Sequence, residues 1–379
     1  MEEYIKAAAE QFEKLLREQL VRQEAMEHGA AARDFAGAEH IVIGVVGGDG
    51  IGPIIVREAR RVLEKLLSEE LASGRVELRE IEGLTLENRL ACGKAVPEDV
   101  LAAIKGCDVL LKGPTTTPKG GTLESANVTL RRELDLYANV RPVTVPEEGI
   151  DWIFFRENTE GEYALGSRGI EVPGKLTMDF KVTTDAGTRR IARAAFEYAR
   201  ANGKKNLAIV TKANIMKKTD GMFTRIAHEV AADYPEIEAE DWYIDIMTAN
   251  LVNSAVRSKF QVFLLPNLYG DILTDEAAQI QGGVGTAGSA NLGARYAMFE
   301  AIHGSAPRKI EAGEGAYANP ASILKAAAML LRHIAMPEKA EQLEAALRLC
   351  MEEERRVVVT GHRDGATAQA FTDYLLEKL

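Results

Sequence analysis

The sequence predicts an α/β fold organised in two domains. Apolar segments with strand character alternate with amphipathic helical segments along most of the chain, an order typical of α/β proteins. The 379 residues are enough to build two domains with substantial cores. We find no internal repeat and no low-complexity tract that would favour another architecture.

The composition narrows the classes of function. The chain carries 46 Lys and Arg against 57 Asp and Glu, a formal net charge of -11, so no overall charge attracts it to nucleic acid or to an anionic membrane. The three cysteines lack the spacing of metal ligands, which fits a reducing compartment. We find no apolar run long enough to span a bilayer and no signal-peptide pattern, and we expect a cytoplasmic protein.

Residues 1–39 are predicted to form an N-terminal helical extension. The helix covers residues 2–28, and its apolar stripe consists of Ile5, Ala8, Phe12, Leu15, Leu16 and Leu20. The polar face is mixed in charge rather than basic, which argues against membrane attachment. We expect this helix to pack against the body of the protein or against a partner subunit.

The main body begins at about residue 40, and its elements follow in order. Predicted strands cover residues 41–46, 76–82, 107–112, 152–155, 206–211 and 262–271. Predicted helices cover residues 53–67, 97–105, 125–138, 185–201 and 221–232, and two more begin at residues 321 and 337. Residues 164–184 combine β character with glycine turns, which predicts a hairpin.

Residues 113–142 place hydroxyl, amide and guanidinium groups just after a glycine-rich bend. If a helix begins near Ser125, that serine is a good N-cap and Asn127 lies in the first turn, where free N–H groups favour anions. Arg131 lies on the same face as Asn127, and Arg141 follows in extended chain. Arginine binds carboxylates through paired hydrogen bonds, so the pattern predicts a site for a small polyanion. In the structural alternative Ser125 only caps the helix and Arg131 belongs to a solvated face.

The turn GGDGIGP connects the first strand of the body to its helix. Its glycines, Gly48, Gly50 and Gly52, are spaced G-x-G-x-G instead of the G-x-G-x-x-G of Rossmann folds. No Lys-Ser/Thr pair follows that would indicate a phosphate loop. Taken alone, this turn is weak evidence for a nucleotide site.

Seven motifs in order carry a resemblance to one family. They are GDGIGP at 48–53, SANVTLR at 125–131, RENTEGEY at 156–163, TKANIMK at 211–217, GDILTD at 270–275, HGSAP at 303–307 and Asn319-Pro320. Over about residues 40–379 the chain resembles the β-decarboxylating dehydrogenases, the isocitrate and 3-isopropylmalate dehydrogenase family, and is closest to isocitrate dehydrogenase. The resemblance implies a large twisted mixed sheet flanked by helices, and a dinucleotide site without the Rossmann fingerprint.

The resemblance also implies the domain organisation. Residues 40–136 and 283–379 would form a large, cofactor-binding domain, and residues 137–282 a small domain with a dimer-interface hairpin at about 162–184. The active site would lie in a cleft between the domains. The resemblance also implies a homodimer or higher homo-oligomer with shared active sites.

The substrate-binding residues follow from the same resemblance. Arg131, Arg141 and Arg156 would clamp the carboxylates of a small tricarboxylate, and Ser125 and Asn127 would hold its γ-carboxylate arm. Isopropylmalate enzymes place apolar residues at the last two positions, so isocitrate is favoured. The expected reaction is metal-dependent oxidative decarboxylation of isocitrate to 2-oxoglutarate and CO2 with reduction of NAD or NADP, a step of the tricarboxylic acid cycle.

The resemblance assigns metal-binding and proton-handling roles. Asp271 and Asp275, with Asp245 from a neighbouring subunit, would bind Mg²⁺ or Mn²⁺ through hard oxygen ligands. Lys212, also from the neighbour, would assist removal of the hydroxyl proton, and Tyr163 would protonate the enol carbon after decarboxylation. Without the resemblance, Lys212 is a surface lysine, Tyr163 a core tyrosine and Asp271 a helix cap.

The cofactor-binding residues are expected on several loops. Thr117 would face the nicotinamide side, and the remaining contacts would come from Asn214, His303, Gly304, Ser305, Ala306 and Asn319. Arg308 and Lys309 stand where NAD-linked relatives carry an aspartate, which slightly favours NADP. Gly361 replaces the tyrosine expected of an NADP enzyme, which is closer to NAD-linked relatives.

Two alternatives remain at this point. A related dehydrogenase acting on homoisocitrate, 3-isopropylmalate or tartrate is disfavoured by Ser125 and Asn127. A non-catalytic regulatory subunit of a hetero-oligomeric isocitrate dehydrogenase is disfavoured because Tyr163, Lys212 and the aspartates are all present.

Overall fold

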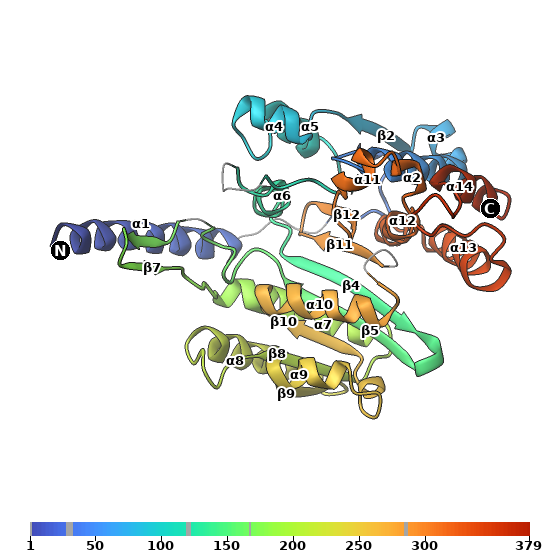
Figure 1. The fold of residues 1–379 in the computed structure, drawn as a ribbon. Coiled ribbons are helices and arrows are strands. Elements are labelled where there is room, and N and C mark those ends of the chain that lie inside the picture. The colour runs from blue at the N-terminus through green and yellow to red at the C-terminus, as the bar shows by residue number, and fades with distance from the viewer. Residues whose placement is uncertain (1, 28–32, 119–122, 167, 284–286) are drawn as a thin grey trace. The chain divides into compact units, whose positions relative to one another are not determined.

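The computed structural model describes residues 2–27, 33–118, 123–166, 168–283 and 287–379. The chain divides into two compact units (Figure 1). Unit 1 consists of Met1–Ala31 and Tyr137–Ile280, and unit 2 consists of Ala32–Leu136 and Gln281–Leu379. In the described ranges no helix is both long and apolar enough to cross a membrane.

Unit 2 is built on five strands in the order β2-β1-β3-β12-β11. Their bounds are β1 Ile41–Val46, β2 Val76–Ile81, β3 Val109–Lys112, β11 Gly288–Leu292 and β12 Ala297–Ala301. Neighbouring strands run parallel, except that β11 is antiparallel to β12. Every residue of β1 is buried, as expected of a parallel strand covered on both faces.

Helices cover the strands of unit 2. They are α2 Gly52–Leu66, α3 Ser68–Ser73, α4 Leu86–Cys92, α5 Glu98–Lys105, α6 Ala126–Glu133, α11 Pro307–Glu311, α12 Ala321–His333, α13 Pro337–Arg348 and α14 Ala368–Leu376. The apolar helix α12 packs on β11, β12 and α2 (Figure 1). The prediction of one helix over 125–138 is wrong, because α6 ends at Glu133 and residue 138 already begins a strand.

Unit 1 also has five strands, in the order β4-β5-β10-β8-β9. Their bounds are β4 Ala138–Val145, β5 Ile150–Glu157, β8 Asn206–Thr211, β9 Glu238–Tyr243 and β10 Val262–Leu265. Only β4 and β5 pair antiparallel; the other neighbours are parallel. A separate hairpin joins β6 Ile170–Val172 to β7 Leu176–Met178, inside the segment where a hairpin was predicted.

The helices of unit 1 are α1 Glu2–Glu27, α7 Asp185–Ala201, α8 Thr219–Ala231, α9 Ile244–Leu251 and α10 Asn267–Ile280. Helix α1 lies against α7 and the hairpin (Figure 1). Leu15 is buried there, and the Gln11 amide donates to the carbonyl oxygens of Arg168 and Gly169 at 3.0 and 2.8 Å. The prediction that the N-terminal helix packs against the body is therefore confirmed.

The predicted strand over 262–271 is wrong in its second half. Strand β10 ends at Leu265, and α10 begins at Asn267. Pro266 has no N–H to donate to a neighbouring strand, and its fixed φ suits the residue before a helix. The carbonyl of Pro266 accepts the Gly270 N–H at 3.0 Å. Asp271 consequently lies in the second turn of α10, which rules out its interpretation as a helix cap.

Candidate active site

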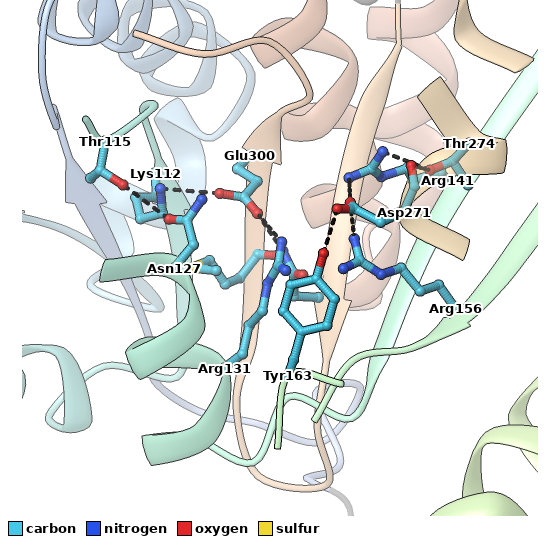
Figure 2. Close-up of polar contacts among 12 residues, drawn as sticks. Lys112, Thr115, Asn127, Arg131, Arg141, Arg156, Tyr163, Asp271, Thr274 and Glu300 are labelled. Atoms are coloured by element: carbon cyan, nitrogen blue, oxygen red, sulfur yellow. Dashed lines mark hydrogen bonds and ion pairs between the residues drawn. The ribbon is translucent and has the colours of Figure 1, made fainter. Parts of the chain in front are cut away.

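Unit 1 brings together five of the predicted site residues. Arg141 comes from β4, Arg156 from β5, Asp271 and Asp275 from α10, and Tyr163 from the segment after β5 (Figure 2). Asp271 and Asp275 are four residues apart and therefore lie on one face of the helix. The two carboxylates predicted as metal ligands thus come from the same helix.

Asp271 is the centre of this group. Its Oδ2 accepts a hydrogen bond from the Tyr163 hydroxyl at 2.8 Å, and its Oδ1 accepts a hydrogen bond from Arg156 Nη1 (Figure 2). Arg141 Nη1 contacts Asp275 Oδ1 at 3.0 Å and donates to Thr274 Oγ1 at 2.7 Å. The two guanidinium groups are buried, whereas the Asp275 carboxylate is 62% exposed. The arginines are thus fixed, and carboxylate oxygens remain accessible.

A glycine allows this arrangement. A Cβ built on Gly270 would lie 2.5 Å from Cγ of Arg156, far inside van der Waals contact, so only glycine lets α10 approach β5 so closely. The amide oxygen of Asn267 accepts from Arg156 Nε at 3.0 Å and from Nη2 at 2.7 Å. Asn267 therefore orients the guanidinium toward Asp271.

Lys212 and Asp245 form a second group in unit 1. Lys212 follows β8, Asp245 lies in the first turn of α9, and Lys212 Nζ is 2.6 Å from Asp245 Oδ1. The hydrogen bond from Lys212 holds the pKa of Asp245 below its usual value. Among the described residues, no three carboxylate, imidazole or thiol groups converge as a metal site. Asp245 therefore does not complete a metal site with Asp271 and Asp275 of its own chain.

Unit 2 carries the other predicted substrate residues. Asn127 and Arg131 lie on α6, and the Asn127 amide oxygen accepts from Thr115 Oγ1 at 3.1 Å (Figure 2). Arg131 is only 9% exposed, so its interpretation as part of a solvated helix face is wrong. Ser125 does occupy the N-cap position of α6, but its side chain makes no capping hydrogen bond. The interpretation of Ser125 as a simple cap is also wrong.

Two residues that the sequence prediction missed lie beside Arg131. Glu300 Oε2 is 3.0 Å from Lys112 Nζ, and its Oε1 is 3.5 Å from Arg131 Nη2 (Figure 2). Burial alone would raise the pKa of Glu300, but Lys112 and Arg131 outweigh it and bring the value to about 2. Lys112 ends the buried strand β3 and Glu300 lies inside the buried strand β12, so a charge within or at the end of an apolar strand is the signal that could have revealed them.

The predicted cofactor segments of unit 2 also meet. A Cβ on Gly50 would lie 2.0 Å from the carbonyl oxygen of Ser305, so the turn of 48–53 packs backbone to backbone on the HGSAP segment. The Ser305 and Thr116 hydroxyls lie 2.6 Å apart, next to Thr117. Burial lowers the pKa of His303, which keeps that imidazole neutral. The glycine turn, weak evidence in the sequence, is therefore part of this loop cluster.

The basic residues after HGSAP differ in how they are engaged. Lys309 donates to the Gly361 carbonyl, whereas Glu314 lies 3.3 Å from His362 and 3.8 Å from Arg363. Arg308 is exposed. Of the remaining predicted cofactor residues in unit 2, Asn319 accepts the Ala321 N–H at 2.9 Å, Gly304 is exposed, and Ala306 has a left-handed backbone. Asn214 is exposed as well, but it belongs to unit 1.

Comparisons with known proteins identify the family of the chain. The family model for isocitrate/isopropylmalate dehydrogenase matches residues 42–375. "Isocitrate dehydrogenase [NADP]" of Rickettsia prowazekii (strain Madrid E) is 39% identical over 315 residues, which are 81% of this chain and 62% of that protein. "Isocitrate dehydrogenase [NAD] subunit 2, mitochondrial" of Schizosaccharomyces pombe is 37% identical over 331 residues, 84% of this chain and 83% of that protein.

Solved structures give the same result. The crystal structure of isocitrate dehydrogenase from Methylococcus capsulatus matches with a TM-score of 0.79 and 36% identity, covering 89% of this chain and 99% of that one. The predicted α/β fold is thereby confirmed. With a family match over most of its length and relatives near 38% identity, the chain belongs to the isocitrate/isopropylmalate dehydrogenase family.

Proposed function

We propose that this chain is an isocitrate dehydrogenase, which oxidises isocitrate and releases CO2 to form 2-oxoglutarate while a nicotinamide cofactor is reduced. The observation that carries the proposal is the pair of buried arginines in unit 1, Arg141 and Arg156, beside the carboxylates of Asp271 and Asp275, in a member of this family. Fixed guanidinium groups suit a tricarboxylate, because each can form paired hydrogen bonds with a carboxylate, and Arg131 is expected to add a third. Asn127 and Ser125 add polar groups where an isopropyl substrate needs apolar contact.

Asp271 and Asp275 are the residues that would hold a divalent metal. Their oxygen atoms are the hard ligands that Mg²⁺ and Mn²⁺ prefer, and both side chains are at least one-third exposed. Two carboxylates fit as part of a metal site, and Asp245 of a second subunit would supply the third. When bound, the metal acts as a Lewis acid on the substrate's hydroxyl and carbonyl oxygen.

Tyr163 and Lys212 would move the protons. The hydroxyl of Tyr163 is held by Asp271 at 2.8 Å, so a proton is fixed beside the carboxylate that would contact the metal. In the proposed reaction Tyr163 delivers a proton to the enol carbon that loses CO2. Lys212, from a second subunit, would assist removal of the substrate hydroxyl's proton, a step that requires its amine in the neutral form. In this chain Lys212 Nζ lies 2.6 Å from Asp245 Oδ1, a contact that keeps the two side chains together.

A homodimer is the assembly that would complete the site. Large exposed apolar side chains lie near Lys212, Asp245 and Asp271 in the sequence. They are Ile215, Met216, Tyr243, Ile246, Val252 and Ile272. They follow Lys212, flank Asp245 and follow Asp271. Exposed apolar residues that accompany polar groups of a proposed shared site are what a subunit interface would cover.

For the cofactor, we propose NADP with Arg308 as the residue that binds the 2′-phosphate. Glu314 already pairs with Arg363 and lies 3.3 Å from His362, and Lys309 donates to a backbone carbonyl. That leaves Arg308 as the exposed cation best suited to a phosphate. Changing Arg308 to Gln should raise KM for NADP about tenfold or more and leave KM for NAD unchanged.

The proposal is tested by following reduced cofactor with isocitrate and Mg²⁺, in parallel with NADP and NAD. The same assay is run with homoisocitrate, 3-isopropylmalate and tartrate. Turnover with isocitrate above all others is the expected result. Faster turnover with another acid would move the assignment to that substrate. No formation of reduced cofactor with any acid would favour a regulatory subunit.

A further inference from the structure

The last two turns of α1 reach the segment that joins Arg156 to Tyr163. Helix α1 lies outside residues 42–375, the part of the chain that the family model matches. Arg22 Nη1 lies 3.1 Å from Glu160 Oε1, and Arg22 Nη2 donates to Thr159 Oγ1 at 2.9 Å. The next residue, Gln23, accepts the Ala186 N–H at 3.2 Å, in the first turn of α7.

Arg22 meets a buried pair of carboxylates. Glu157 and Glu160 are each 2% exposed. The Glu157 carboxylate accepts the N–H groups of Thr159 and Glu160 at 2.9 and 2.7 Å. The Glu160 carboxylate accepts the Thr184 N–H at 3.0 Å, where α7 begins. This turn therefore depends on two charges that were removed from water, and such charges need compensation.

The cations that face this turn come from two helices. Arg22 arrives from α1, and Arg190 of α7 donates to the same Thr159 oxygen at 3.2 Å. Burial, followed by the charge of Glu160, raises the pKa of Glu157 to about 7. Glu157 is thus close to losing its negative charge at neutral pH, and Arg22 is the cation in ion-pair contact with Glu160.

The turn is coupled to the proposed active-site groups. Asn267 Nδ2 donates to the Glu160 carbonyl at 3.0 Å, while Asn267 Oδ1 accepts from Arg156. Glu157 directly follows Arg156, and Tyr163 lies three residues after Glu160. A shift of the turn would consequently move both the clamp for the substrate and the proton donor.

We propose that Arg22 is a positioning residue for the reaction: through the Thr159–Glu160 contact, helix α1 holds the segment that carries Arg156 and Tyr163. The inference rests on the proposed function for its activity readout. It assigns to the N-terminal helix a role in the active site of its own subunit.

The test compares R22Q with R22K and with R17Q as the matched control. Arg17 lies on the same helix and pairs with Glu13, but both are well exposed. We expect R22Q to lower kcat/KM for isocitrate about tenfold, R22K to recover part of it, and R17Q to match the wild type. Glu157 is ionised above its pKa of about 7, where the turn needs the cation most, so the ratio of wild-type to R22Q activity should grow from pH 6 to pH 8.5.

Amide hydrogen exchange supplies a readout that needs no substrate. The N–H groups of Thr159 and Glu160 should exchange about tenfold faster or more in R22Q than in the wild type, while β8 stays unchanged. Equal exchange and a flat activity ratio, or equal losses in R22Q and R17Q, would overturn the inference. If the wild type does not turn over isocitrate, the proposed function fails, and exchange at this turn still decides the role of Arg22. If R22Q does not fold, R22K is compared with R17Q by the same two measurements.

Discussion

Replacing Glu300 with Gln tests the buried charge network beside Arg131. The side chain is almost fully buried, between Lys112 at 3.0 Å and Arg131 at 3.5 Å. Its pKa falls from 4.5 to about 2, and each unit corresponds to about 1.4 kcal/mol, so ionised Glu300 stabilises the folded state by about 3 kcal/mol at neutral pH. Seen from Lys112, the same change leaves a buried ammonium without compensation, and the typical cost of about 3–5 kcal/mol for breaking a buried pair agrees with this figure.

The expected result of E300Q is a fall of about 3 kcal/mol in the free energy of unfolding at pH 7, measured by urea titration. The folded pKa is depressed, so the contribution is complete above the unfolded pKa and is lost as pH falls from about 5 toward 2. The difference between E300Q and the wild type should therefore shrink as the pH is lowered to 4 and below. KM for isocitrate should rise, because Glu300 no longer orients Arg131.

The matched control is E98Q, which removes an exposed carboxylate paired with Lys94. That change should leave stability close to that of the wild type, as expected of a surface pair. If E300Q is as stable as E98Q at pH 7, or if its deficit does not depend on pH, the reasoning about the buried network is refuted.

Three further changes test other groups. Y163F removes the hydroxyl that donates to Asp271, so kcat should fall about 100-fold or more while KM and the unfolding midpoint hold; steady-state kinetics with less than a twofold change would contradict the proton-donor role. D275N keeps an oxygen atom that can contact Arg141 but removes the negative charge. The Mg²⁺ concentration that gives half-maximal activity should therefore rise about tenfold or more. An unchanged Mg²⁺ titration would exclude Asp275 as a ligand. Burial lowers the pKa of His333 to about 4, so the stability of the fold should decrease as the pH drops from about 6.5 to 4. H333Q should flatten the plot of melting temperature against pH in this range. A plot with the same slope as that of the wild type would assign the pH dependence to another group.

Periodicity predicted the long elements of the fold well. Helices α2, α7 and α12 and strands β1 and β8 lie where the sequence placed them, because each is either strongly amphipathic or continuously apolar. The short helices α3 and α4 were missed, since six or seven residues give too little periodicity to recognise. The predicted end of β10 is wrong because apolar residues continue past Pro266 in the sequence. The strand ends at Leu265, since proline has no N–H to donate to a neighbouring strand.

The site was predicted unevenly for a physical reason. Motif residues such as Arg156, Asp271 and Tyr163 carry recognisable side chains at fixed spacings, and the structure places them in contact. Glu300 and Lys112 come from strands far apart in the chain, so only the paired register of β3 and β12 brings them together. Arg22 lies on a helix whose sequence predicted only an amphipathic surface, and a single long-range ion pair leaves no periodic trace.

The missing side chain at Gly270 makes the group formed by Arg156, Asp271 and Tyr163 in unit 1 a rigid assembly. Helix backbone rests directly on the Arg156 stem, so the guanidinium, the Asp271 carboxylate and the Tyr163 hydroxyl keep their mutual spacing during any motion of unit 1 as a whole. Even alanine at this position would need more than 1 Å of displacement to restore ordinary van der Waals contact. Efforts to redesign substrate choice are therefore better directed at Ser125 and Asn127 than at this assembly, which cannot be adjusted in small steps.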